Sequence, residues 1–172
     1  MSTNLYALCV PSYLQTLGAV AGFLEKGRLH CQSAGIDPKD LVELRLAPDM
    51  LPFRFQIVSV LHHSLGTIQA LESGRFSPPK DGGLDYAGLQ KQVVEAQETL
   101  KGLSAADIDR HAGRDILFQL GDMKLPFVAE DFVLSFSLPN FYFHAATAYD
   151  ILRMKGAPLG KGDFLGAMRM KR

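Results

Sequence analysis

Three histidines are the clearest candidates for chemistry in this chain. His62 and His63 are neighbours in one apolar segment, and His144 lies in another, at the end of the run Pro-Asn-Phe-Tyr-Phe-His. An imidazole can exchange a proton near neutral pH, hydrogen-bond a ligand or coordinate a metal ion. These residues therefore predict either a small-molecule pocket with acid–base chemistry or a metal site. A third interpretation is that His144 is a core histidine bonded to a carbonyl or hydroxyl.

The predicted helix that carries His144 covers residues 138–156. Pro139 suits the first turn of a helix, and Gly156 suits the position just past its end. At 100° per residue, one inward arc of this helix holds His144, Ala148, Ile151 and Leu152. Tyr149 and Asp150 lie off that arc.

Other polar side chains near His144 could share its chemistry, through tyrosine hydroxyls or an amide that binds substrate or caps the helix. The predicted catalytic residues are His144, Tyr142 and Tyr149. The predicted ligand-binding residues are His62, His63 and Asn140. Tyrosines on packed helices are, however, more often amphipathic core residues than catalysts.

The adjacent histidines belong to a second long helix, predicted over residues 50–73 with Asp49 as its cap. One side of the helical wheel is apolar and holds Val58, Leu61, Leu65 and Ile68. The opposite side is polar and holds Gln56, Ser59, His63 and Thr67. His62 lies at the apolar margin, so we expect His62 to point toward apolar neighbours and His63 toward the polar face.

The remaining helices follow from caps and apolar periodicity. We predict a first long helix over residues 5–32 stopped by Gly35, and a short helix over 37–44 capped by Asp37. A Pro/Gly-rich loop at 74–84 leads to a third long helix over 85–101, capped by Asp85. Ser104 opens a capped helical turn.

An alternating pattern then predicts a β-hairpin at about residues 113–128. With Gly121-Asp122 as its turn, three pairs share one face: Leu120 with Met123, Phe118 with Leu125, and Ile116 with Phe127. Pro126 requires an open edge. Residues 130–137 are a possible helical lead-in, and the tail at 157–172 is expected to pack back on the helices through Leu159, Phe164 and Leu165.

Composition limits the function classes. The 172 residues are 47% hydrophobic with zero formal net charge, which suits one domain, residues 1–172, without bulk attraction to nucleic acid or anionic membranes. No apolar run is expected to span a membrane, and no leader is recognised, so a cytoplasmic, intracellular location is expected. Cys9 and Cys31 should lie about 30 Å apart on one helix, too far to form a disulfide.

The run from residue 138 to 166, together with Ala-Pro-Asp-Met at 47–50, resembles an uncharacterised domain-of-unknown-function (DUF) family. That family is grouped with the DinB/YfiT-like superfamily of proposed metalloenzymes, and the likeness covers most of the chain. The resemblance implies an all-α fold: a DinB/YfiT-like four-helix bundle, here with a small β-hairpin inserted before the last helix.

The superfamily also implies a metal site, with one histidine on the second helix and two spaced four apart on the last. His62 or His63 fits the first position and His144 the second, so the candidate metal ligands are His62 and His144. The third position is Ala148, which cannot bind a metal ion. Catalytic zinc normally needs three protein ligands, so we expect a degenerate site with weak affinity for Zn²⁺ or Ni²⁺ and no required cofactor.

Three functions remain open at this point. The leading hypothesis is a homodimeric bundle that binds an unknown small molecule at the degenerate site, with or without a metal-independent activity. The first alternative is a metal-dependent DinB-like hydrolase or thiol transferase, and the second is a non-enzymatic dimeric interaction module. The homodimer is expected from apolar helix faces and the open hairpin edge.

Overall fold

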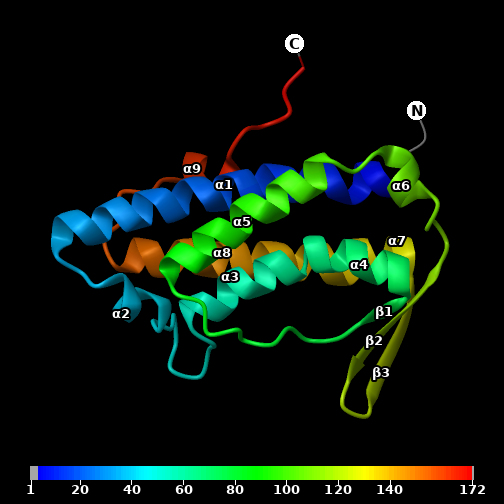
Figure 1. Ribbon diagram of the computed structural model, residues 1–172, viewed down its shortest axis with the longest axis horizontal. Helices are drawn as coiled ribbons and strands as arrows, with labels where there is room; N and C mark the ends of the chain where they lie inside the picture. Colours follow the sequence, from blue (N-terminus) through cyan, green and yellow to red (C-terminus); the bar gives the residue numbers. More distant parts are fainter. Residues whose placement is uncertain (1–3, 172) are drawn as a thin grey trace.

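The computed structural model describes residues 4–171, which form a mostly helical molecule with a small sheet at one end (Figure 1). The longer helices are α1 (Leu5–Ala34), α3 (Phe53–His62), α4 (Leu65–Ser73), α5 (Tyr86–Lys101) and α8 (Leu138–Met154). The shorter ones are α2 (Pro38–Val42), α6 (Ala105–Asp109), α7 (Ala129–Asp131), the π-helix η1 (Phe132–Ser137) and α9 (Lys161–Leu165).

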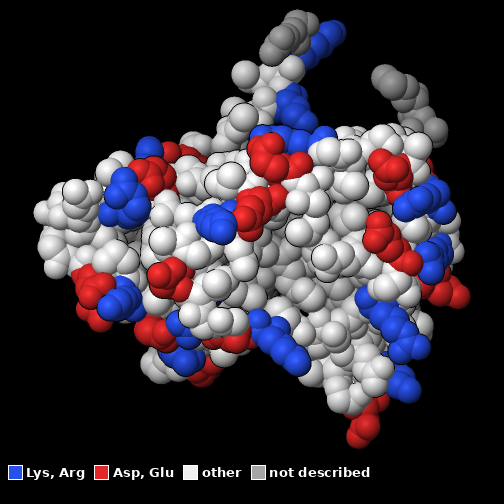
Figure 2. Space-filling model, in the orientation of Figure 1, with Lys and Arg blue, Asp and Glu red and all other residues white. Residues whose placement is uncertain are grey.

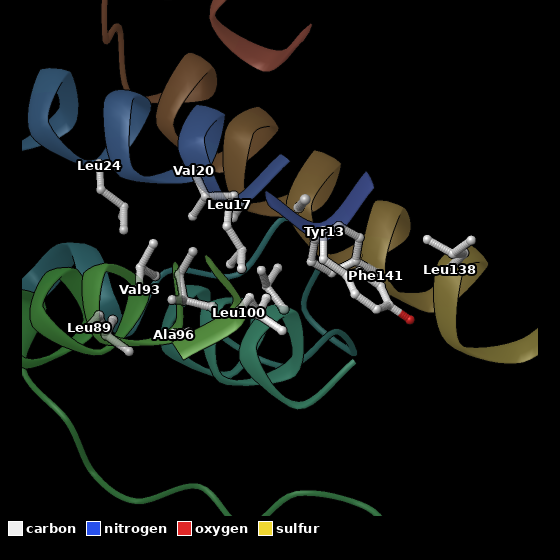
Figure 3. Close-up of a cluster of buried hydrophobic side chains, with 14 of the residues drawn as sticks. Tyr13, Leu17, Val20, Leu24, Leu89, Val93, Ala96, Leu100, Leu138 and Phe141 are labelled. Carbon is white, nitrogen blue, oxygen red and sulfur yellow. The ribbon is translucent and has the colours of Figure 1, made fainter. Parts of the chain in front are cut away.

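The main core lies where α1 faces α5 and α8 (Figure 3). Each helix contributes fully buried side chains: Tyr13, Leu17, Val20 and Leu24 from α1, Leu89, Val93 and Leu100 from α5, and Phe141 from α8. Burial of each such side chain stabilises the fold by about 1.5–3 kcal/mol. This core holds α8 in place, and α3 packs on the same helix.

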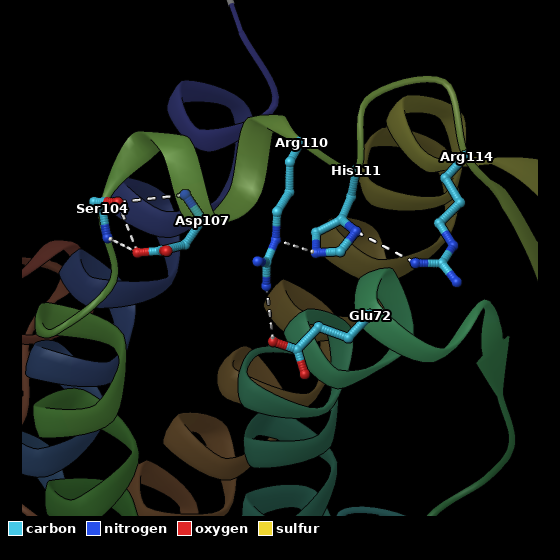
Figure 4. A network of polar contacts seen from close by, with 6 residues as sticks. All are labelled: Glu72, Ser104, Asp107, Arg110, His111 and Arg114. Carbon is cyan, nitrogen blue, oxygen red and sulfur yellow. Dashed lines mark hydrogen bonds and ion pairs between the residues drawn. The ribbon is translucent and has the colours of Figure 1, made fainter.

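The helix boundaries predicted from caps are confirmed at three starts and one stop. The carboxylates of Asp37 and Asp85 accept hydrogen bonds from the backbone N–H groups of Lys39 and Gly88. Ser104 forms a capping box with Asp107 at the start of α6 (Figure 4). These bonds satisfy N–H groups that would otherwise lack partners in the first helical turn. Gly35 ends α1 with a φ of 68°, a left-handed conformation that favours glycine.

The second predicted long helix is wrong as a single element, because it breaks into α3 and α4 at His63 and Ser64. The Ser64 hydroxyl donates to the carbonyl of Val60 at 2.8 Å, a backbone-directed bond that bends helices. The helix also begins at Phe53 rather than at Met50, with no side-chain cap at its start.

The sequence left open which of the two adjacent histidines faces the bundle interior, and the structure shows that it is His63. The polar side of the segment is the buried one: Gln56, Ser59, His63 and Thr67 are 2%, 1%, 6% and 0% exposed. The apolar Val58, Leu61 and Leu65 are only partly buried. The inner face is polar because it meets a buried set of hydroxyl groups on η1 and α1, described below.

The predicted hairpin is confirmed, with β2 (Asp115–Leu120) and β3 (Met123–Val128) paired in the expected register. The predicted loop before α5 additionally contains β1 (Arg75–Phe76), which pairs in parallel with β2. The molecule is therefore mostly helical, with a small three-stranded sheet in the order β1-β2-β3 in place of a hairpin alone. Pro126 lies on the outer strand β3, where its missing N–H costs no sheet hydrogen bond.

The last helix is confirmed, and its lead-in is helical but partly in the wider π form. The tail returns to the helices as expected: Leu159 is buried and the ring of Phe164 packs on Tyr149, with centroids 5.9 Å apart. Leu165 remains 38% exposed. The tail thus packs on the bundle, with Leu159 and Phe164 the more buried of the three predicted side chains.

By length and composition alone, α1 could cross a membrane, because an 18-residue window has a mean hydropathy of 1.4. The expectation that no apolar run approaches such a length is therefore not met. Half of that window is buried against the other helices, as in the core helix of a globular domain.

Acidic and basic side chains are interspersed over the face seen in Figure 2, so this face offers no surface of one charge.

Candidate functional site

Two of the three candidate histidines come together between α3 and α8. The rings of His63 and His144 are nearly parallel, at 14°, with centroids 5.9 Å apart. His63 is the residue that follows α3, and His144 lies in the second turn of α8. Helix α3 packs along α8, so two residues 81 positions apart in the chain form one imidazole pair.

A glutamine sets the tautomer of His144. The Gln56 side-chain amide donates to the carbonyl of Leu51 at 2.7 Å, which leaves its oxygen facing the His144 ring. That oxygen lies 2.7 Å from Nδ1 of His144 and can only accept a hydrogen bond. Nδ1 therefore carries the proton, and Nε2 presents a lone pair. Burial lowers the pKa of His144 to about 4, so the ring is neutral at pH 7.

His63 is more deeply buried. Its side chain is 6% exposed, and its Nδ1 has no hydrogen-bond partner within residues 4–171. A buried polar atom without a partner costs about 1–3 kcal/mol and is unusual in a native fold. Burial, followed by the neighbouring imidazoles of His62 and His144, lowers the pKa of His63 to about 3. His63 is therefore also neutral at pH 7.

The backbone of His63 is held by hydroxyl groups at the helix break. The Thr67 N–H bonds to Ser64 instead of to His63, which frees the His63 carbonyl. Ser137 donates to this carbonyl at 2.8 Å, and the Thr67 hydroxyl lies 3.2 Å from it. The fully buried Tyr13 hydroxyl lies 2.8 Å from the Ser137 oxygen. Together these groups fix the main chain that carries the His63 ring.

The π-helix η1 brings Ser137 and Phe136 to this position. A π turn contains an additional residue, and such turns are frequent at functional sites. Ser137 points to the His63 carbonyl, and the ring of the preceding Phe136 lies 5.7 Å from the His63 ring. One turn therefore contributes both a backbone contact and an aromatic contact to His63.

His62 lies edge-on to His63, with ring centroids 5.6 Å apart, but its polar contact is elsewhere. Its Nε2 lies 2.7 Å from the carbonyl oxygen of Ser77, and its ring stacks on Phe76 with centroids 4.2 Å apart. A surface cavity of about 220 Å³ includes His62 and Gly66 in its lining but neither His63 nor His144. His62 therefore belongs to a different surface, on the outer side of the break.

Within residues 4–171, the other predicted site residues make no hydrogen bond to the pair. Asn140 donates to the carbonyl of Phe136 in η1 at 2.7 Å, one turn earlier in the chain. Tyr142 is 40% exposed. The Tyr149 ring packs between Phe23 and Phe164 and serves the core and the tail. The roles predicted for these three residues stay predictions.

The residues do not fit the three-histidine metal site that the family resemblance implies. Ala148 is fully buried and presents a methyl group one turn after His144. Nowhere in residues 4–171 could a group of three His, Cys, Asp or Glu hold a metal ion. His62, one of the two expected ligands, is bonded to a carbonyl. We therefore assign no chemical step to a metal.

A second buried histidine belongs to a structural network (Figure 4). Nε2 of His111 accepts from the Arg110 guanidinium at 3.2 Å, and Arg110 also lies 3.9 Å from Glu72. Burial first, and then Arg110 and Arg114, lower the pKa of His111. This network ties the turn after α6 to α4, and Arg114, just before β2, lies 3.4 Å from Nδ1 of His111.

Sequence reasoning missed two polar partners of the imidazole pair, Gln56 and Ser137. Gln56 was recognisable in principle, because it shares the spacing of Ser59, His63 and Thr67 along one helix face. Ser137 was not recognisable, because its role depends on a π turn that no residue pattern indicates.

The fold is similar to that of a solved DinB family member protein from Shewanella denitrificans, with a TM-score of 0.81 and 28% sequence identity. The match covers 98% of this chain and 95% of that one. The chain belongs to the DUF1993 family, a domain of unknown function whose family model matches residues 5–165. The predicted family resemblance is thereby confirmed. None of the curated proteins compared with this chain matches it.

Proposed function

We propose that this protein is a DinB-like four-helix bundle that binds a small organic molecule at the His63–His144 pair without a metal. The observation that carries the proposal is the Nδ1 atom of His63, buried and without a partner within residues 4–171, beside a second imidazole with a free lone pair. A ligand that hydrogen-bonds there would remove the cost of the unpaired atom.

The charge state of the pair favours binding over acid–base catalysis. A general base works best when its pKa lies near the operating pH. His63 and His144 have pKa values of about 3 and about 4, so both are poor bases at pH 7 in the free protein. As neutral rings they are good hydrogen-bonding groups. The acid–base role first considered for these residues is therefore the less favoured one.

Two measurements test this proposal. Isothermal titration with Zn²⁺ and Ni²⁺, with elemental analysis of the purified protein, should detect no tight stoichiometric metal. A thermal-shift screen of neutral and charged small molecules should find ligands whose stabilisation is lost in His144→Ala and kept in His30→Ala. His30 is a suitable control because its Nε2 contacts the Lys155 carbonyl, away from the pair.

Each alternative function has its own outcome in these experiments. Tight metal binding that His144→Ala abolishes would replace the proposal with a metalloenzyme, a DinB-like hydrolase or thiol transferase. Absence of any ligand, with unchanged stability in both His63→Ala and His144→Ala, would favour a non-enzymatic interaction module.

The proposal includes a cytoplasmic homodimer. Its support is the outer half of the hairpin, where Leu120, Met123 and Leu125 are 52%, 46% and 37% exposed on one face. Exposed apolar surfaces of this kind often mark protein contacts. Light scattering that gives the mass of one chain would contradict the dimer, and cell fractionation tests the location.

A further inference from the structure

The surroundings of the imidazole pair are aromatic. The His63 ring packs on Phe76 and Phe136, with centroid distances of 5.3 and 5.7 Å. The His144 ring packs on Phe55 and Phe143, at 6.2 and 5.2 Å. Phe143 is 55% exposed, so the aromatic cluster extends from the core to the surface of α8. A flat ligand can pack on such rings with offset or edge-to-face geometry.

The polar atoms of the site are few and defined. Nε2 of His144 is a hydrogen-bond acceptor, because Nδ1 donates to Gln56. The His63 side chain is more than nine-tenths buried, and its Nδ1 has no partner within the described residues. The acceptor on His144 calls for a donor on the ligand.

Within residues 4–171, the aromatic and hydrogen-bond partners of these two rings carry no charge. They are phenylalanines, the Gln56 amide and other imidazoles. The guanidinium of Arg54, on the same helix as Gln56, is bound to Asp81 and Glu43. An anion or a cation placed here would lose its hydration without gaining an opposite charge. The faces of the phenylalanines could attract a cation, so a cationic probe belongs in the test.

We propose that the site recognises an uncharged aromatic molecule with a hydrogen-bond donor, packed against the phenylalanine rings with its donor on Nε2 of His144. This inference rests on the proposed function and names the ligand class for the same site. It differs from a metal-assisted site, because recognition depends on ring contacts and one neutral hydrogen bond.

Four small probes of similar size separate the possibilities. Phenol is neutral and carries a donor, toluene lacks the donor, benzoate is an anion and benzylammonium is a cation. Affinities are measured at pH 7 by titration calorimetry, and the binding position by NMR shifts of the Hε1 protons of His63 and His144. We expect phenol to bind about tenfold more tightly than any of the other three, because each of them lacks a matched hydrogen bond or buries a charge.

Two variants test whether phenol binds at the His63–His144 pair. His144→Ala should weaken phenol binding about tenfold, whereas the control His30→Ala should leave it within about twofold. Shift changes at His63 and His144 in the unmodified protein locate phenol even if His144→Ala fails to fold. Shift changes confined to other residues would overturn the inference.

The remaining outcomes separate this inference from the proposed function. Benzoate or benzylammonium binding as tightly as phenol would overturn the ligand class, while binding at the pair would still stand. Toluene binding as tightly as phenol would also overturn the ligand class, because it would show that the hydrogen-bond donor does not contribute to affinity. If none of the probes binds but the wider screen finds a charged ligand at the pair, only the ligand class fails. If no molecule of any kind binds, both fail.

Discussion

The hydroxyl of Ser137 donates a hydrogen bond of 2.8 Å to the main-chain carbonyl of His63. This bond joins the π turn that precedes α8 to the break between α3 and α4. Both atoms are buried, so neither can exchange this bond for one to water. The position of the His63 ring therefore depends on a residue of a different helix.

Replacing Ser137 by alanine should lower the free energy of unfolding by about 1–3 kcal/mol, because the buried His63 carbonyl and Tyr13 hydroxyl each lose a partner. Ser135→Ala is the matched control, since that hydroxyl is exposed and bonds only within its own turn. We expect the control to change stability by about 0.5 kcal/mol or less. Urea unfolding measures both, and equal losses would contradict the role of Ser137.

Replacing Gln56 by glutamate should raise the pKa of His144 from about 4 to about 5 or higher. The new carboxylate would lie where the amide oxygen now accepts from Nδ1, and a negative charge favours the protonated ring. NMR titration of the His144 Hε1 proton measures the change. Gln69→Glu, on the exposed side of α4, should leave this pKa unchanged; a similar rise in both variants would argue against the contact.

Stability should fall as the pH drops from 6.5 toward 4. Histidines in the unfolded chain titrate near 6.5, but burial lowers the pKa of His63 to about 3 and that of His144 to about 4. In this range the unfolded chain binds protons that the folded protein does not bind. Each of the two histidines then lowers the free energy of unfolding by up to about 1.4 kcal/mol for every pH unit of acidification.

Urea unfolding at pH 7, 6 and 5 tests this pH dependence. The double variant His63→Gln with His144→Gln should show a flatter dependence over this range, whereas His30→Gln should keep the slope of the unmodified protein. An unchanged slope in the double variant would assign the acid sensitivity to other groups.

Phe76→Ala should destabilise the fold by about 3–5 kcal/mol, because the ring is buried at the junction of the sheet, His62, His63 and Phe132. Phe143→Ala removes the same side chain from a position that is 55% exposed and should cost about 1 kcal/mol or less. Thermal or urea unfolding compares the two. A large loss of stability in Phe143→Ala would mean that this ring packs in the core and is not available to a ligand.

Local signals predicted most of the fold. Asp37, Asp85 and Ser104 cap the helices that they were expected to cap, and the Gly121-Asp122 turn sets the hairpin register. These features depend on residues within a few positions of one another, which sequence patterns report directly. The two-residue strand β1 was missed because its pairing with β2 is determined by distant residues.

The site was harder to predict than the fold. His144 was placed on the correct arc of its helix, and His63 on the polar side of its own, but the sequence did not show which side of that helix is buried. The wheel places apolar residues inside by default. Here the partners of that face are themselves polar, namely Ser137 and Tyr13, and they come from segments about 70 and 50 residues away in sequence.

The π turn at residues 132–137 has a consequence for any chain built on the same plan. One residue more or fewer in a helix rotates everything on its far side by about 100° about the helix axis. Deleting a single residue there would turn β3 relative to α8 and His144, whereas the pairing of β2 with β1 keeps the sheet beside α4. The additional residue thus allows the hairpin to pair with β1 while Ser137 reaches the His63 carbonyl.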